Sequence, residues 1–414
     1  MMKQDIVREA TRLTRAGQLI EATVLLQRML RGETAPDATS GATARIALTG
    51  REPLIIDAKA DTIEETDSPN LARPASTQPR MLRALEIKRQ SGLALRGLIK
   101  RAPLSTPDIV PEGARFIEGS YSNPVGSRAY KLFIPSRYLG QQLPLVVMLH
   151  GCTQSPDDFA AGTRMNFIAE DQTCFVVYPA QRSDANQAKC WNWFRTADQQ
   201  RGRGEPSLIA GITRQIMRDY SVDPKRVYVA GLSAGAAAAA VMGATYPDLY
   251  AAIGVHSGLA CGTASDLPSA FVAMRRGSLA ASSGSDNLSV LPIVPTIVFH
   301  GDRDVTVHPS NGDYILEQSM KATGRQKKVH RGRVTGGHAY TCTIHADANG
   351  REIFEHWNIH GAGHAWSGGS SVGSYTDPRG PDATREMLRF FLQHSLPQQP
   401  GELASPFFNP SGMA

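Results

Sequence analysis

The chain has 414 residues, of which 41% are hydrophobic, and a formal net charge of +6 at neutral pH. A chain of this length and composition can bury a large core, and one α/β domain occupies only part of it. No apolar stretch is long enough to span a membrane, and the first residues lack the uninterrupted apolar core of an export signal. We therefore expect a cytoplasmic protein with no transmembrane segment.

The first 110 residues are predicted to form an extension with three parts. Apolar residues recur at helical spacing over residues 5–30, and residues 31–79 have the polar composition of a flexible linker. Residues 80–101 carry seven basic side chains and one acid, Glu86, with apolar residues spaced as in an amphipathic helix. This basic helix either docks weakly on an anionic membrane or granule surface or packs, solvated, on the following domain; we favour the second interpretation.

Strands and helices alternate over residues 111–396, which are predicted to form one catalytic domain. The pattern predicts a mostly parallel central sheet with helices on both faces. The expected elements are a hairpin from strands 116–121 and 128–134, strand 143–149, a helix from Pro156 capped by Ser155, helix 207–220, strand 226–230 with helix 236–242, and strands 295–301 and 353–360. Residues 397–414, rich in Pro, Gly and Ser, are expected to be a flexible tail.

A catalytic serine is predicted at Ser233. It is the centre of a G-x-S-x-G motif, Gly231 to Gly235, that lies between a strand and a helix, as the nucleophile elbow of an α/β-hydrolase requires. A strand that turns tightly into a helix strains the central serine and leaves no room for side chains at the two glycines. The alternative is an ordinary tight turn between a strand and a helix.

Two aspartates follow the strand 295–301, where the acid of a hydrolase triad is expected. The chain order of this fold is Ser, then acid, then His. We assign Asp304, in the pattern His-Gly-x-x-Asp, as the acid and keep Asp302 as the reserve. The other interpretation of each is a turn or helix-capping aspartate, and it holds for at least one of the two.

The general base is predicted at His364, on a glycine-flanked loop after the strand 353–360. A histidine there can reach over the edge of the sheet toward the serine. Four other histidines lie inside strands or near their ends, and we interpret them as structural: His256, His300, His356 and His360.

The N–H groups of Ala234 and Cys152 are the expected oxyanion donors. One donor in this fold comes from the residue after the nucleophile, and the other comes from the loop after the third strand of the sheet. That loop is His150 to Gln154, where Gly151 allows a close approach of the backbone.

Four separated motifs give the chain a family resemblance over roughly residues 112–395. It resembles the polyhydroxybutyrate depolymerase-family esterases, relatives of feruloyl and acetylxylan esterases, in His150–Gln154 (HGCTQ), Cys190–Phe194 (CWNWF), Gly231–Ala236 (GLSAGA) and Gly361–Gly368 (GAGHAWSG). The resemblance implies an α/β-hydrolase domain, serine esterase chemistry, and Ser233, Asp304 and His364 as the triad. It also implies that Cys152 and Cys190 lie close together beside the site, and it makes secretion the alternative to a cytoplasmic location.

The chain departs from secreted family members in its lack of an export signal, a Thr/Ser-rich linker and a carboxy-terminal polymer-binding module. We therefore expect hydrolysis of short hydroxyalkanoate oligomers or other small esters, with feruloyl- or acetyl-type carbohydrate esters as the alternative. A non-catalytic granule or membrane adaptor that acts through the basic helix is a third hypothesis.

Other residues bear on the pocket and on possible partners. Trp191 and Trp366 are either pocket walls or core residues, while Trp193 and Phe194 are expected in the core. The cysteine count of five is odd and no export signal is visible, so free thiols are expected and a Cys152–Cys190 disulfide is the less favoured option. No cluster has the spacing of metal ligands, and we expect no metal, no other cofactor and no nucleic-acid partner.

Overall fold

The structure is a computed structural model, and it describes residues 109–277, 294–320 and 326–397. The predicted helices over 5–30 and 80–101, the linker between them and the tail from 398 onward lie outside these residues. Within them, no helix is long and apolar enough to cross a membrane.

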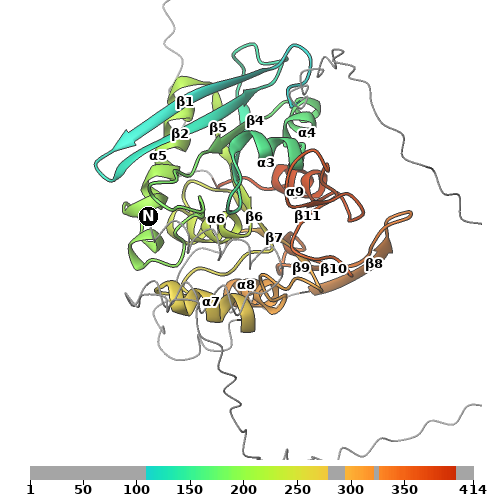
Figure 1. Ribbon diagram of the computed structural model, residues 1–414. Coiled ribbons are helices and arrows are strands. Elements are labelled where there is room, and N and C mark those ends of the chain that lie inside the picture. Colours follow the sequence, from blue (N-terminus) through green and yellow to red (C-terminus); the bar gives the residue numbers. More distant parts are fainter. Residues whose placement is uncertain (1–108, 278–293, 321–325, 398–414) are drawn as a thin grey trace, which may run out of the picture. The chain divides into compact units, whose positions relative to one another are not determined.

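One ten-stranded sheet organises the described residues, with strand order β1-β2-β4-β3-β5-β6-β7-β10-β9-β8 (Figure 1). The middle strands, from β4 to β10 in this order, run parallel to one another. The pairs at both edges are antiparallel. The strands are β1 (Arg115–Asn123), β2 (Gly126–Ile134), β3 (Leu143–Leu149), β4 (Phe175–Pro179), β5 (Val222–Leu232), β6 (Ala252–His256), β7 (Thr296–Gly301), β8 (Gln326–Arg333), β9 (Ala339–Ala346) and β10 (Glu352–His360).

Helices cover both faces of this sheet. The helical elements are α3 (Pro156–Thr163), α4 (Met165–Gln172), η1 (Thr196–Gln199), α5 (Gly204–Asp219), α6 (Ala234–Thr245), α7 (Leu267–Arg276), α8 (Ser310–Met320) and α9 (Ala383–Leu392). Residues of α5, α6, α7 and α8 belong to one apolar cluster, and residues of α3, α4 and α9 belong to a second. The prediction of an α/β-hydrolase-type sheet with helices on both faces is confirmed.

Local signals fixed several boundaries correctly. The strand 143–149 is observed as β3, and its seven residues are all buried, as expected for a central parallel strand. The Ser155 side chain accepts a hydrogen bond from the Asp158 N–H at the start of α3, with Pro156 in the first turn. Helix α5 begins three residues before the predicted start because Asp198 Oδ1 accepts the Glu205 N–H, at 2.7 Å, and so satisfies its first turn.

A short two-stranded sheet, β11 (Trp366–Ser367) with β12 (Thr376–Asp377), follows the loop that carries His364. It was not predicted, because two-residue strands leave no periodic pattern in the sequence. It fixes the chain just beyond His364.

Candidate active site

The turn at Ser233 has the geometry that its glycines predict. Ser233 joins β5 to α6 with a φ of 57°, in the left-handed region that non-glycine residues rarely adopt, and its N–H donates to the His256 carbonyl at 2.9 Å. A Cβ added at Gly235 lies 2.0 Å from the Leu149 carbonyl oxygen, and one at Gly231 lies 2.4 Å from the backbone of Gly235. Both glycines are therefore required by close backbone approach.

Asp304 and His364 are brought together by neighbouring strands. They follow β7 and β10, which pair in parallel, so both residues lie at the carboxyl end of the sheet. His364 Nδ1–H donates to Asp304 Oδ2 at 2.7 Å, and the carboxylate is fully buried. Because Nδ1 carries the proton, the neutral ring keeps its lone pair on Nε2.

The Asp304 carboxylate is held in its charged form by several donors. Its Oδ1 accepts the N–H groups of Thr306 and Val307, each at 2.9 Å, and His300 Nε2 lies 3.4 Å from Oδ2. Burial by itself raises the pKa of Asp304, but the hydrogen bonds from His300 and His364 outweigh it, so the pKa lies well below its usual range. This carboxylate is available to orient an imidazole and to stabilise its cation.

Asp302 has different partners. Its carboxylate accepts His360 Nδ1–H at 3.0 Å and the Gly361 N–H at 2.7 Å. A backbone hydrogen bond from Arg303 N–H to the Ala362 carbonyl, 3.0 Å, lies beside these contacts. Asp302 therefore ties the loop after β7 to the first residues of the loop that carries His364, and it does not contact His364 itself. The sequence predicted Asp302 only as the reserve acid, and this link between two loops was not predicted.

The other histidines have structural partners. His256 stacks against Phe299 and Trp366, its Nε2 accepts the Ser367 N–H at 3.0 Å, and burial lowers its pKa to about 3. His300 Nε2–H donates to the Val307 carbonyl at 2.9 Å, while burial lowers the pKa of His356 to about 4. His150, in the loop after β3, accepts the Gln181 N–H on Nε2, and burial lowers its pKa to about 4. The low pKa values keep the rings of His256, His356 and His150 neutral near pH 7, and all four rings are buried or nearly so.

The loop His150–Gln154 lies beside Ser233. A Cβ added at Gly151 is 3.7 Å from Ser233 Cβ. Gln154, which the sequence did not single out, is buried; its Oε1 accepts the Gly151 N–H at 2.9 Å, and its Nε2 donates to Asp158 Oδ2 at 3.0 Å. Among the described residues, the N–H groups of Cys152 and Ala234 have no backbone or side-chain acceptor. Both N–H groups are thus unpaired within the described part of the chain.

Ser233 is not hydrogen-bonded to His364 among the described residues. Such contacts are often long without substrate and tighten only when it binds. The structure thus joins the acid to the base and seats the serine on a strained turn beside two free N–H groups.

The expectation of free thiols is wrong for two cysteines. Cys152 and Cys190 form a disulfide, which brings the loop after β3 against the segment Cys190–Phe194. This agrees with the proximity that the family resemblance implied. Cys174 and Cys342 are buried free thiols, and Cys261 is a half-buried one.

The interpretation of Trp191 and Trp366 as pocket walls is not supported. Both are fully buried, and each indole N–H has an internal acceptor, the His150 carbonyl for Trp191 and Thr384 Oγ1 for Trp366. Trp366 also packs edge-on against Phe159. Since no ring face is left for a ligand, both are core residues, as is Trp193.

Glu205, at the start of α5, connects several segments beneath the disulfide. Its buried carboxylate accepts the Asn192 N–H at 2.6 Å and the Asn192 side-chain amide at 2.8 Å. The Gln181 amide and the Arg128 guanidinium, 3.3 Å away, complete the set. This junction holds the Cys190–Phe194 segment in place, and no sequence motif marks Glu205 for the role.

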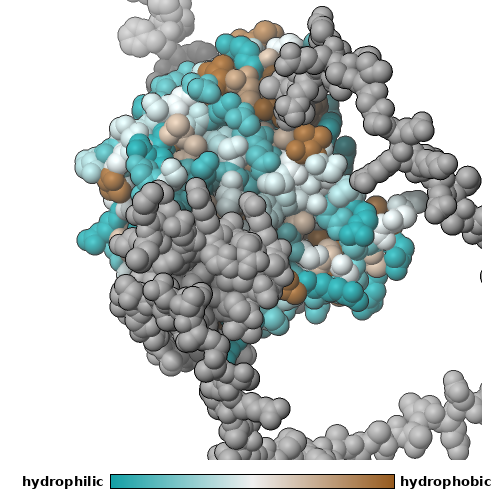
Figure 2. Space-filling model, in the orientation of Figure 1, coloured by the Kyte–Doolittle hydropathy of each residue, from teal (hydrophilic) through white to brown (hydrophobic). Residues whose placement is uncertain are grey.

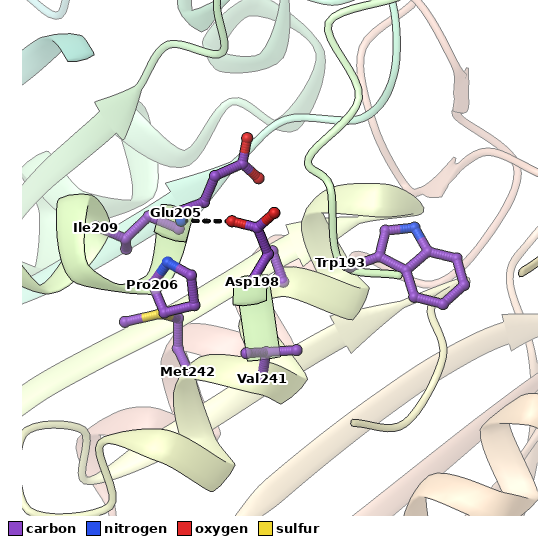
Figure 3. A pocket seen from close by; sticks show the side chains of 8 residues that line it. Trp193, Asp198, Glu205, Pro206, Ile209, Val241 and Met242 are labelled. Atoms are coloured by element: carbon purple, nitrogen blue, oxygen red, sulfur yellow. Dashed lines mark hydrogen bonds between the residues drawn. The ribbon is translucent and has the colours of Figure 1, made fainter. Parts of the chain in front are cut away.

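A small hollow lies next to this junction (Figure 3). It is lined by Trp193, Asp198, Glu205, Pro206, Ile209, Ala238, Val241 and Met242. None of the candidate catalytic residues lines it, and we interpret it as a packing defect between α5 and α6 rather than the substrate site. Among the described residues, no group of three His, Cys, Asp or Glu side chains is arranged to hold a metal.

Comparison with known proteins decides the family. The family model described as Esterase PHB depolymerase matches residues 128–336, about half of the chain. The chain belongs to this family. The matched residues of this Esterase PHB depolymerase family member include Cys152, Ser233 and Asp304, while His364 lies beyond them.

Curated relatives agree with this assignment. The chain is 34% identical over 252 residues to poly(3-hydroxyalkanoate) depolymerase C of Paucimonas lemoignei, covering 59% of each chain. It is 27% identical to a poly(3-hydroxybutyrate) depolymerase of Ralstonia pickettii, of which it covers 48%. It is 33% identical over 140 residues to feruloyl esterase B of Neurospora crassa, covering 34% of this chain and 46% of that one. The chain thus spans about half the length of these relatives.

A solved structure supports the fold. An acetyl xylan esterase from Aspergillus awamori superimposes with a TM-score of 0.51 at 20% identity, covering 68% of this chain and 99% of that one. Similarity at this level of identity supports the α/β-hydrolase fold and nothing finer.

Proposed function

We propose that the chain is a serine esterase that hydrolyses carboxylic esters. The observation that carries the proposal is the buried 2.7 Å hydrogen bond from His364 Nδ1 to Asp304, at the same end of the sheet as the strained turn at Ser233. Residues 111–396 carry the activity in this proposal. Membership of an esterase family supports it.

Each proposed step uses a group already described. His364 Nε2 takes the proton of the Ser233 hydroxyl as Oγ attacks the ester carbonyl carbon, and Asp304 stabilises the imidazolium. The electron pair of the C=O bond moves to oxygen, where the N–H groups of Ala234 and Cys152 bind it. His364 then protonates the departing alcohol. A water molecule attacks the acyl-enzyme by the same route and releases the acid.

The proposed substrates are short hydroxyalkanoate oligomers or other small esters. The names of two relatives, poly(3-hydroxyalkanoate) depolymerase C and poly(3-hydroxybutyrate) depolymerase, support this choice. A feruloyl- or acetyl-type carbohydrate esterase is the second candidate, supported by the name of the relative feruloyl esterase B. The same triad serves both, so the difference lies in the pocket.

The Cys152–Cys190 disulfide bears on location. Disulfides persist in oxidising compartments and are rare in the reducing cytosol. We therefore favour an extracytoplasmic location over the cytoplasmic one expected from the sequence. Alkylation of the native protein with and without reductant tests for the disulfide itself. Two more cysteines should react after reduction.

Labelling with a fluorophosphonate probe tests the nucleophile. The purified protein should be labelled, and Ser233→Ala should abolish labelling and turnover while it leaves the thermal unfolding temperature within a few degrees. Ser257→Ala is the matched control, because Ser257 is a buried serine that also has a positive φ, 52°, and should leave labelling intact. Undiminished labelling of the Ser233 variant would reject the assignment.

A substrate panel then separates the candidates. Hydroxybutyrate oligomers, p-nitrophenyl acyl esters, ethyl ferulate and acetylated xylan are compared by kcat/KM. Preference for hydroxybutyrate oligomers supports the first candidate, and preference for ethyl ferulate or acetylated xylan supports the second. If none is hydrolysed, the adaptor hypothesis based on residues 80–101, which lie outside the described residues, gains its first support.

A further inference from the structure

The edge strand β8 is strongly basic. Four of its eight residues are Lys or Arg and none is acidic, and every residue except Gly332 is exposed. Residues 321–346, which include β8 and its partner β9, contain six Lys or Arg residues and no Asp or Glu. This short segment carries as much formal charge as the net charge of the whole chain, which is +6.

The cations of β8 are nearly unpaired. Lys328 Nζ lies 3.7 Å from Glu352 Oε1, and the Arg333 guanidinium donates to the Gly337 carbonyl at 3.3 Å. Lys327 and Arg331 form no ion pair with any described residue. Charged side chains on an edge strand prevent it from pairing with strands of other chains, and this role accounts for some of the cations on β8. Protection of the edge does not require four cations on a hairpin that has no acidic residue.

These cations lie on both faces of the strand. Side chains alternate along a strand, so Lys327, Arg331 and Arg333 share one face, while Lys328 and His330 lie on the other. Residues two positions apart on one face are about 7 Å apart. Where Figure 1 places β8 and β9, the face seen in Figure 2 is mainly hydrophilic. We call this surface of Lys327, Lys328, His330, Arg331 and Arg333 the basic ridge.

The composition of the basic ridge selects among anionic partners. A planar membrane contacts only one face of a strand. Stable interfacial binding also needs an apolar face, and Val329 is the only exposed apolar residue of β8. Single-stranded nucleic acid needs aromatic platforms for its bases. The Tyr340 ring is not available to stack on a base, because one side covers Gly332 and the ring packs against Trp357. A Cβ added at Gly332 would lie 2.5 Å from the Tyr340 ring. A flexible, linear polyanion without bases can contact both faces.

The register of the sheet places the basic ridge near the candidate site. Arg333 is opposite Ala339 on β9, and Ala339 is opposite His360, the last residue of β10. The loop that carries His364 begins at the next residue. A polymer bound along β8 therefore ends two strands away from that loop.

We propose that the basic ridge on β8 binds an acidic polysaccharide through its carboxylate or sulfate groups. The binding is electrostatic and weakens as salt screens it. The inference does not depend on the proposed esterase activity, since it rests on the exposed charges of β8 alone.

Binding of the full-length chain to polygalacturonate and to heparin tests the proposal, with the two probes separating carboxylate from sulfate recognition. We expect salt-sensitive binding of at least one, and a loss of affinity of about tenfold or more in Lys327→Gln with Arg331→Gln. Hydrolysis of a soluble p-nitrophenyl ester or, should the chain lack that activity, the unfolding temperature checks that this variant is folded.

Two matched variants remove the same charge elsewhere. Arg137→Gln with Arg218→Gln neutralises two exposed arginines far from β8 in the sequence, and Arg83→Gln with Lys88→Gln neutralises two residues of the basic stretch 80–101. Both should bind within about twofold of the wild type. Equal losses in all three variants, or a loss only in the 80–101 variant, would overturn the proposal. Tighter binding to anionic phospholipid vesicles or single-stranded DNA than to both polysaccharides would also overturn it.

Discussion

The turn at Ser233 and the pair Asp304–His364 are built in different ways. Ser233 lies between β5 and α6, which adjoin in the chain, and the glycines that permit its conformation are two residues away on each side. Asp304 and His364 are 60 residues apart and meet only because β7 and β10 are neighbours in the sheet. A local motif therefore specifies the first region, whereas the second depends on strand order and on contacts between loops. The two regions should respond differently to substitution.

After the nucleophile itself, the largest effect is expected at Asp304. In Asp304→Asn the side chain keeps its size but loses the charge that fixes the tautomer of His364 and stabilises its cation. We expect turnover to fall about a thousandfold or more with little change in KM. Steady-state kinetics on a p-nitrophenyl ester measures this. A loss below tenfold would show that the pair is structural.

On the Ser233 side, Gly235→Ala should act on folding rather than on chemistry alone. The added methyl group meets the carbonyl oxygens of Leu149 and His150, at 2.0 and 2.6 Å, and these belong to buried backbone that cannot easily move. We expect a loss of about 3 kcal/mol of unfolding free energy. Urea denaturation measures it, with Gly363→Ala as the control because an added Cβ there meets nothing within 4 Å.

A smaller effect is expected at Asp302, which acts through the loop of His364. Asp302→Asn keeps an oxygen for the Gly361 N–H but loses the charge beside His360, so turnover should fall about tenfold or less. Asp184→Asn, which removes an exposed carboxylate paired with Arg182, is the matched control and should be neutral. If Asp302→Asn proved more damaging than Asp304→Asn, the role of the acid would pass to Asp302.

Buried neutral histidines make stability depend on pH in both regions. Burial lowers the pKa of His256 to about 3 and those of His150 and His356 to about 4. Below about pH 6.5 the unfolded chain binds protons that the folded chain excludes, so stability falls as the pH decreases toward 4. Each ring contributes about 1.4 kcal/mol per pH unit in that window. Urea unfolding at pH 7, 6 and 5 measures how steeply the unfolding free energy changes with pH. In His256→Phe the unfolded chain should bind about one proton fewer on unfolding, so this slope should be smaller.

Much of the Ser233 region could be predicted from the sequence, because the motif, its flanking strand and its helix are contiguous. The positions of Asp304 and His364 followed from chain order and strand ends. The choice of Asp304 over Asp302 rested on the pattern His-Gly-x-x-Asp alone, since both aspartates follow the same strand. The pairing of β7 with β10 brings both loops to one edge, and the hydrogen bonds there show that Asp304 contacts His364 while Asp302 contacts His360.

The features that the sequence missed or left open have a common physical origin. Trp191 and Trp366 lie within motifs, and sequence position alone could not decide between pocket wall and core because it does not reveal that their indole N–H groups have internal acceptors. The Cys152–Cys190 bond depends on two loops that are 38 residues apart in the chain. The edge hairpin of β8 and β9 left no clear periodicity, because β8 is exposed on both faces.

The junction at Glu205 has a practical consequence for altering specificity. Arg128, Gln181 and Asn192 all donate to one carboxylate. Replacing Glu205 would therefore leave these donors without their acceptor, and replacing a donor would leave the buried carboxylate short of a partner. A mutational library aimed at new acyl groups should leave these four positions fixed. Substitutions are better made at exposed residues near the candidate site, such as Val305 and Tyr375, because no shared buried acceptor limits which residues these positions can accept.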